Sequence, residues 1–291
     1  MSITFIDRRA EGPRAPDAAA NPLARLSDEQ IEQIGREFDA VHDEVFADLG
    51  EPDARYIRGK DRDLGYEIMR IDPHQRWHPI YVLQPLYNLV LMAFFEWGVA
   101  LHDLNAEAIR AGEKSREQVV GELKDIGLKA RRQVVKDYIA FPLLSGRSWR
   151  STLAANFTAN VVRNVWAHSI IFCGHFPDQT YTFSEEEVAQ ETRGGWYVRQ
   201  LLGAANIDGG PLFHLMTGNL SFQVEHHLFP DMPSSRYAEI APRVRQVCAR
   251  HGLPYNTGPL RRQLGTVHRT ILRLAFPGGR PRPKPAPAPA P

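Results

Sequence analysis

The sequence contains little cysteine and almost no excess of charge. Its two cysteines, Cys173 and Cys248, are too few for a disulfide framework or a cysteine-rich zinc motif. Its 35 basic residues balance 34 acidic ones, so the net charge of +1 does not indicate binding to nucleic acid. Near the start, Asp7, Arg8 and Arg9 interrupt the apolar residues, and we predict no signal peptide there. The composition therefore excludes a disulfide-stabilised scaffold and a strongly basic nucleic-acid-binding protein.

Both ends of the chain are rich in proline, alanine and arginine and poor in large apolar residues. We therefore predict a disordered arm over residues 1–26 and a Pro-rich disordered tail over residues 271–291. A chain of 291 residues could form one large domain or two smaller ones, and we predict one domain over residues 27–270.

The domain is predicted to open with an amphipathic helix. Ser27 and Gln30 have the spacing of a capping box, and the helix is expected to end near Gly50. Its apolar positions recur at helical spacing: Ile31, Ile34, Phe38, Val41, Val45, Phe46 and Leu49.

Two apolar stretches are candidates for membrane-spanning helices. Residues 79–101 approach the roughly 20 residues that cross a bilayer, although a buried core helix is the alternative. Residues 151–176 are also long enough to span. Residues 103–137 between them are charged and predict an exposed helical connector. Because this connector is as basic as the segments outside the two stretches, the positive-inside rule gives no orientation.

Polar residues interrupt the second apolar stretch. Asn164 and His168 are four positions apart, so a helix would place them on one face. Ionisable residues at membrane depth are costly and usually mark function. A histidine in an apolar run is otherwise a hydrogen-bonded core residue, and spacing alone leaves both interpretations open.

The most informative stretch is Gln223-Val224-Glu225-His226-His227. In a helix, Gln223, His226 and His227 share one face, and two neutral imidazoles with an amide oxygen suit iron, zinc or copper. A surface histidine pair is the alternative. His214 lies shortly before this stretch and is a candidate for a group that supports such a site.

A second histidine pair, His74 and His78, has an H-x-x-x-H spacing. Pro73 and Pro79 flank it and leave barely one turn of helix, so we interpret it as a loop. Trp77 within it is typical of a membrane interface.

Three segments resemble membrane fatty acid desaturases. Residues 219–230, N-L-S-F-Q-V-E-H-H-L-F-P, resemble the last histidine box in its Q-x-x-H-H form, which acyl-CoA, acyl-lipid and front-end desaturases share. Residues 164–168 are similar to an N-x-x-x-H element, and residues 59–66 to the segment after the second box of bacterial members. The likeness runs from about residue 58 to 260, and more weakly from residue 27.

This resemblance implies an all-α, membrane-associated helical bundle with a cytosolic helical cap and two non-heme irons. Such enzymes use O2 to introduce a double bond into an acyl chain. His168, His226 and His227 would be catalytic iron ligands, and Asn164 and Gln223 weaker ones. A lipid- or CoA-linked fatty acyl substrate, a lipid bilayer and a separate electron donor, ferredoxin or cytochrome b5-like, are implied. The implied location is a membrane crossed several times, as in the bacterial inner membrane, with the site facing the cytosol.

The sequence departs from the family pattern in its first half. His42 is the only histidine before Gly59, so neither an H-x-x-x-H nor an H-x-x-H-H box precedes that residue. No stretch of about 20 apolar residues precedes residue 79. We therefore predict an incomplete bundle, internally truncated near residues 57–58.

Three histidines and two amides cannot hold two irons in the family manner. The sequence thus predicts at most one partial metal site and a desaturase that is inactive in this form. The alternative is a non-catalytic membrane protein, an inactive remnant or a partner of an intact desaturase. A mononuclear metal hydrolase is disfavoured because no acid–base carboxylate stands at a diagnostic spacing from His226.

Overall fold

The computed structural model describes residues 25–46, 69–71, 76–102, 104, 109, 112, 114–181, 183 and 191–278. Most of the predicted N-terminal arm, the tail from residue 279, the segment 59–66, the proposed truncation point and His74 lie outside the described residues.

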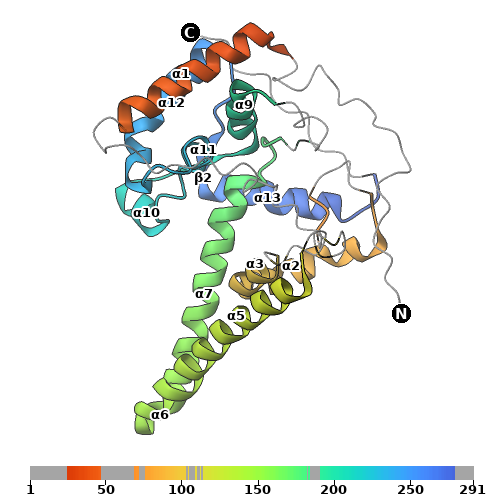
Figure 1. Cartoon of the computed structure of the whole chain (residues 1–291). Coiled ribbons are helices and arrows are strands. Elements are labelled where there is room, and N and C mark those ends of the chain that lie inside the picture. The colour runs from red at the N-terminus through yellow and green to blue at the C-terminus, as the bar shows by residue number, and fades with distance from the viewer. Residues whose placement is uncertain are drawn as a thin grey trace. The chain divides into compact units, whose positions relative to one another are not determined.

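The chain divides into two compact units (Figure 1). The first unit comprises Met1–Gln84 and Ile170–Pro291, and the second comprises Pro85–Ser169. The predicted all-α class is confirmed, since the described residues contain helices and one short pair of strands. The predicted boundary after residue 270 falls inside helix α13 (Leu260–Leu274), where Ile271 and Leu274 are buried.

The first unit is built from helices around a two-stranded parallel ladder. Its strands are β1 (Asn206–Asp208) and β2 (Thr257–Pro259), with Asn206 opposite Thr257. Besides α13, its helices are α1 (Asp28–Phe46), η2 (Pro79–Leu83), α9 (Arg193–Gly203), α10 (Pro211–Met216), α11 (Gln223–Leu228), η5 (Ser234–Arg236) and α12 (Tyr237–Arg250).

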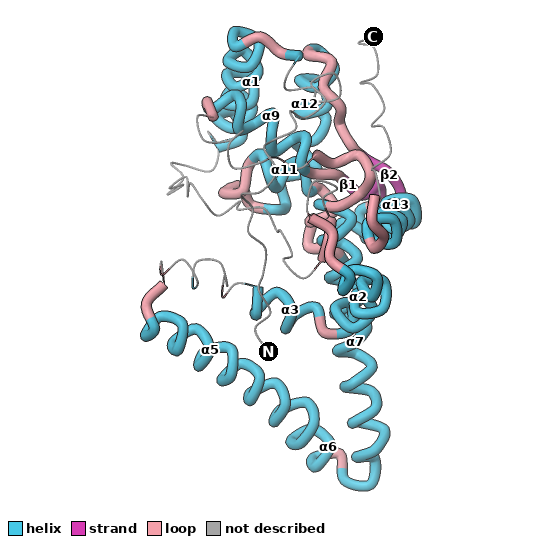
Figure 2. The backbone as a smooth tube through the Cα atoms, turned by 90° about the vertical axis from the view of Figure 1, so that its right-hand side faces the viewer, coloured by secondary structure: helices cyan, strands magenta, loops and turns pink. Residues whose placement is uncertain are grey.

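Helix α1 begins with the predicted capping box. The Gln30 amide donates to Ser27 Oγ at 3.2 Å, and the Ser27 amide donates to Gln30 Oε1 at 2.9 Å. The helix lies against α9 and α12 (Figures 1 and 2). Two glycines permit this approach, because a Cβ added at Gly35 would lie 2.9 Å from the Gly194 Cα atom.

The core of the first unit lies between α1, α9, α11 and α12. The predicted apolar positions Ile34, Phe38 and Val41 of α1 are buried in it. Phe38 meets Tyr197 at 5.3 Å and Phe229 at 6.5 Å between ring centroids. Through Phe229, which directly follows α11 (Gln223–Leu228), the core connects α11 to α1. The other buried members are Val198, Leu201, Leu202, Ala204, Val224, Leu228, Met232, Tyr237, Ile240, Val244, Val247, Cys248 and Leu253.

The second unit is a set of exposed helices. It contains most of α2 (Gln84–Ala93), then α3 (Phe95–His102), α5 (Arg116–Val134), the π-helix η3 (Val135–Ala140), α6 (Phe141–Leu144) and η4 (Gly146–Ser148), with most of α7 (Trp149–His175). Helix α5 has no buried residue, as expected for the predicted connector. Figure 2 shows α5 and α7 diverging from their junction at α6.

The apolar stretch 79–101 is not one straight helix. Its two parts, Pro79–Ala93 and Phe95–His102, are bent by 100°. The break leaves the Glu96 amide at the start of α3 without an intrahelical acceptor, and Asn164 Oδ1 accepts from it at 2.8 Å. A buried core helix does not describe this stretch either, because Leu86 and Leu89 are 64% and 61% exposed.

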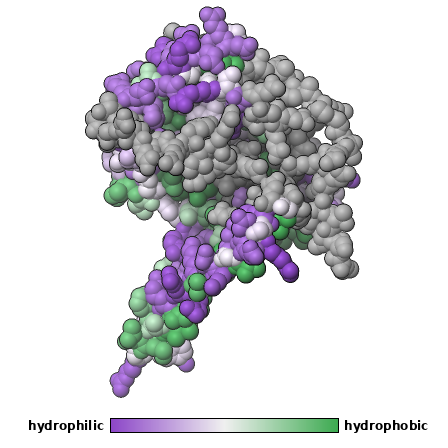
Figure 3. Space-filling model, in the orientation of Figure 1, coloured by the Kyte–Doolittle hydropathy of each residue, from purple (hydrophilic) through white to green (hydrophobic). Residues whose placement is uncertain are grey.

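Within the described part of the chain, no single helix combines the length and hydropathy needed to cross a bilayer, and the bent pair meets these criteria only when its halves are taken together. Residues 151–175 of the second stretch do lie in one continuous helix, α7. Apolar residues are nevertheless exposed around the α6 junction, where Leu143 and Leu144 are 74% and 83% exposed (Figure 3).

We predict that Phe38→Ala lowers the free energy of unfolding of the first unit by about 3 to 5 kcal/mol, because it leaves a cavity at a fully buried aromatic position. Urea unfolding followed by circular dichroism measures the loss. Phe276→Ala, at a residue that is 52% exposed, is the matched control and should change stability by less than about 0.5 kcal/mol. Equal losses in the two variants would contradict the assigned core.

Candidate histidine site

The predicted site residues Gln223, His226 and His227 all lie on α11, a helix of six residues. It follows a tight turn in which Gly218 and Asn219 both have positive φ, 61° and 62°. Glycine and asparagine are the residues that adopt this conformation most readily, so the sequence suits the turn. The turn sets the direction in which α11 begins.

A buried polar cluster anchors α11 from its other side. Glu225 is fully buried and accepts from Asn206 Nδ2 at 2.7 Å and from the Tyr255 hydroxyl at 2.6 Å. Asn206 Oδ1 accepts from the Val224 amide at 2.8 Å. Burial raises the pKa of the Glu225 carboxyl, although these hydrogen bonds act in the opposite direction. The cluster fixes α11 to β1 and to the segment before β2.

The two imidazoles of the pair each bond to a different helix. His227 Nδ1 lies 2.8 Å from Gln200 Oε1 of α9, and His226 Nδ1 lies 3.0 Å from the Tyr237 hydroxyl of α12. Burial, together with the nearby His175 and His226, lowers the pKa of His227 well below its usual value. His227 is therefore neutral at pH 7, the form in which imidazole binds metals.

Sequence reasoning did not select His175, the last residue of α7, which lies in the same cluster. Its ring centroid is 4.8 Å from that of His227, and its Nε2 atom is 3.0 Å from Gln223 Nε2. Gly174 allows this approach, because a Cβ there would lie 2.6 Å from Gln223 Cγ. The available signal was weak: His175 is seven positions after His168, so it falls on the same helical face, directly before Phe176-Pro177.

Gln223 contributes one further feature. The residue is 4% exposed, and among the described residues its Oε1 atom has no hydrogen-bond partner. A buried amide oxygen without a donor is costly, so it is a position where a cation or a donor would be stabilising. The structure thus brings together His175, Gln223, His226 and His227.

The other predicted site residues, Asn164 and His168, lie in the second unit. Asn164 Nδ2 donates to the Asn160 carbonyl at 2.9 Å, and its Oδ1 caps α3. His168 is fully buried, with Nε2 3.3 Å from Asn88 Oδ1 and its ring 5.3 Å from that of Phe95. In the described structure both side chains make hydrogen bonds within the second unit, and their predicted role as iron ligands stays a prediction.

His214 and His78 have local roles. His214 Nδ1 lies 2.7 Å from Ser221 Oγ, and its ring stacks on Phe222 at 4.4 Å, so it supports the turn before α11. His78 accepts from the Ile80 amide at 3.4 Å at the start of η2, and residues 76–78 are not helical, as predicted.

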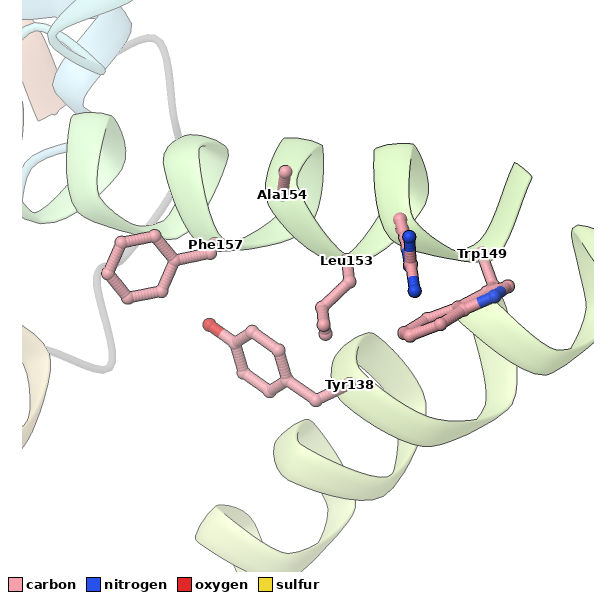
Figure 4. A pocket seen from close by; sticks show the side chains of 6 residues that line it. Tyr138, Trp149, Leu153, Ala154 and Phe157 are labelled. Atoms are coloured by element: carbon pink, nitrogen blue, oxygen red, sulfur yellow. The ribbon is translucent and has the colours of Figure 1, made fainter. Parts of the chain in front are cut away.

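A hollow of about 540 Å³ opens on the second unit (Figure 4). Tyr138 from η3 faces Leu153 and Phe157 of α7 across it, and Trp149 lies at one end. Arg150 also lines the hollow, and its guanidinium is 5.1 Å from the Trp149 ring centroid. Its lining contains no carboxylate or histidine.

A model of the fatty acid desaturase family matches residues 53–259. The chain belongs to the fatty acid desaturase family. It is 46% identical over 225 residues to the NADPH-dependent stearoyl-CoA 9-desaturase of Mycobacterium tuberculosis, an alignment that covers 76% of this chain and 53% of that protein. Fatty acid desaturase 3 of Homo sapiens is 32% identical over 111 residues, which are 38% of this chain and 23% of that protein. The chain spans about half the length of the mycobacterial enzyme, and no solved structure matches it.

Desaturases of this family generally use non-heme iron, so the cluster must be tested against that group. His175, His227 and the buried Gln223 oxygen are three possible metal ligands near one another, and they could form part of the ligand shell of one iron. Across the described ranges, no three His, Cys, Asp or Glu side chains are arranged to hold an ion. The described residues of this desaturase-family chain therefore do not fit two irons.

The buried neutral histidine makes the stability of the chain depend on pH. The pKa of His227 is lowered in the folded state from the ordinary histidine value of 6.5. As the pH falls below 6.5, the unfolded chain therefore binds a proton at His227 before the folded chain does, and the folded state loses stability. We predict that His227→Gln makes the decline between pH 6.5 and 5.5 shallower, by at most about 1.4 kcal/mol per pH unit.

Urea unfolding of the wild type and His227→Gln at pH 7.5, 6.5 and 5.5 measures this effect. The raised pKa of Glu225 acts in the other direction, adding stability that is present in acid and lost as the pH rises, and both proteins share it. Parallel pH profiles for the two proteins would show that His227 is not held neutral by the fold.

Proposed function

We propose that this chain acts in fatty acyl desaturation as an oxidoreductase that introduces a double bond into an acyl chain with O2 as oxidant. Family membership and the 46% identity to a stearoyl-CoA 9-desaturase support this proposal. The observation that carries it is the cluster of His175, His226, His227 and Gln223 within the last histidine box and the end of α7.

We assign iron binding to His175, His227 and Gln223, with His226 beside them. Non-heme iron would supply the O2 chemistry needed to remove hydrogen from an unactivated C–H bond. Rotation of the Gln223 amide about its last bond would place Oε1, instead of the amide nitrogen, opposite His175 Nε2 at 3.0 Å. In that orientation the oxygen would accept from the Nε2–H tautomer of His175, or, with Nε2 unprotonated, both atoms could serve as ligands to the iron. The rotation would also relieve the unpartnered buried oxygen.

His168 and Asn164 remain proposed contributors from the second unit, as the family resemblance implies. Even with them the chain supplies fewer histidines than a di-iron centre of this family uses. In this proposal the remaining ligands come from outside the described residues, which by themselves hold an incomplete site.

The substrate, donor and location are also proposals. The relative's name points to an acyl chain carried as a CoA thioester and to electrons that originate from NADPH. A separate donor such as ferredoxin or a cytochrome b5-like protein would deliver them. Exposed apolar side chains on α2 and α6 support association with a lipid bilayer.

The second candidate function is that of a non-catalytic partner of an intact desaturase. It is favoured because the described residues contain no group of three His, Cys, Asp or Glu side chains that could hold a metal ion. Iron analysis and product analysis of the same preparation separate the two candidates.

We predict that the full chain, purified in detergent and reconstituted with ferrous iron, binds at most about one iron per chain, since its cluster fits part of one ligand shell. His226→Gln/His227→Gln should lose that iron, whereas His268→Gln, a half-buried residue on α13, should keep it. Two irons per chain would contradict the incomplete site.

The same preparations are then supplied with stearoyl-CoA, NADPH, ferredoxin and ferredoxin reductase, and the acyl products are analysed by mass spectrometry. Oleoyl product from the wild type and its absence from the double variant support a desaturase. Bound iron without product supports the partner role. Product from the double variant would overturn the assignment of the histidine pair.

A further inference from the structure

We infer that Gln200 is a positioning residue that holds His227 in the tautomer with hydrogen on Nδ1 and the lone pair on Nε2. The inference deepens the proposed function of the histidine cluster, but the bond on which it depends is independent of any metal. Gln200 is 4% exposed on α9, and its Oε1 atom lies 2.8 Å from His227 Nδ1.

The chemistry of the two atoms decides the tautomer. With the Gln200 amide oriented as in the structure, its carbonyl oxygen can only accept, so a hydrogen bond at this distance places the hydrogen on His227 Nδ1. A neutral imidazole has one N–H group, and Nε2 must therefore carry the lone pair. Gln200 thus leaves the nitrogen that a metal would need in its ligand form.

The neighbouring histidine is held differently. The Tyr237 hydroxyl, 3.0 Å from His226 Nδ1, can both donate and accept, so this bond alone selects neither tautomer.

The position of Gln200 is itself well determined. Its neighbours Tyr197 and Leu201 on α9 are buried in the core, and Gly194 in the first turn of α9 lies against Gly35 of α1. Arg199 Nε also bonds Glu191 Oε1 at 2.7 Å just before the helix. A side chain on a helix packed in this way offers its acceptor at a fixed place.

The tautomer is measured on the full-length, metal-free protein at pH 7.5, labelled with ¹⁵N-histidine and observed by two-bond ¹H–¹⁵N correlation. The His227 signals are assigned by their loss in His227→Gln. In the wild type we expect an N–H at Nδ1 and an unprotonated Nε2. Gln200→Met, of similar size but without an acceptor, should shift the Nε2 resonance toward the protonated range. Gln200→Glu should restore the wild-type pattern, because a carboxylate also accepts.

Gln84→Met is the matched control. Gln84 is fully buried and donates to the Arg70 carbonyl at 3.3 Å, so its loss perturbs the fold without removing a hydrogen bond of the cluster that anchors α11, and the His227 pattern should not change. An Nε2–H tautomer in the wild type would overturn the inference. So would an unchanged spectrum in Gln200→Met. If Gln200→Met does not fold, the wild type and Gln200→Glu still decide the point.

The iron analysis remains a separate measurement. A fixed Nδ1–H tautomer without iron binding would support the role of Gln200 and overturn the proposed iron site. Iron binding together with an Nε2–H tautomer would support the proposed iron site and overturn the role of Gln200.

Discussion

The site depends on one buried carboxylate. A helix of six residues such as α11 has little stability of its own, so its direction must come from contacts with the rest of the chain. Glu225 supplies them by joining Asn206 of β1 and Tyr255 before β2, and Asn206 in turn accepts from the backbone at Val224. Loss of either donor would leave a buried acceptor unsatisfied, at a cost of about 1 to 3 kcal/mol.

The apolar core completes this constraint. Phe229 at the end of α11 packs on Phe38 and Tyr197, while Gln200 and Tyr237 reach the imidazoles from α9 and α12. Helix α1 closes the core over these elements, also through the bond from the Tyr197 hydroxyl to Asp39 Oδ1 at 2.8 Å. The histidines are thus placed by a packed scaffold, and sites supported in this way keep their geometry better than sites on loops.

Local patterns predicted much of this arrangement. The capping box at Ser27, the buried stripe of α1 and the shared face of Gln223 and His227 each follow from residues within one or two helical turns. Contacts made by distant segments could not be predicted in this way. His175 joins the cluster only because Gly174 lets α7 approach Gln223, and Gln200 gives no sequence signal because its role depends on the packing of α9. The bend at Phe94 was missed because hydropathy does not report where Asn164 caps a new helix.

The central claim is that His175 belongs with His227 and Gln223, and cobalt binding tests it directly. Co²⁺ is titrated into metal-free wild type, His175→Gln and His268→Gln, and its absorption spectrum is followed. We expect His175→Gln to weaken Co²⁺ binding by about tenfold or more and His268→Gln to have no effect. Wild-type affinity in His175→Gln would show that the end of α7 is not part of the site.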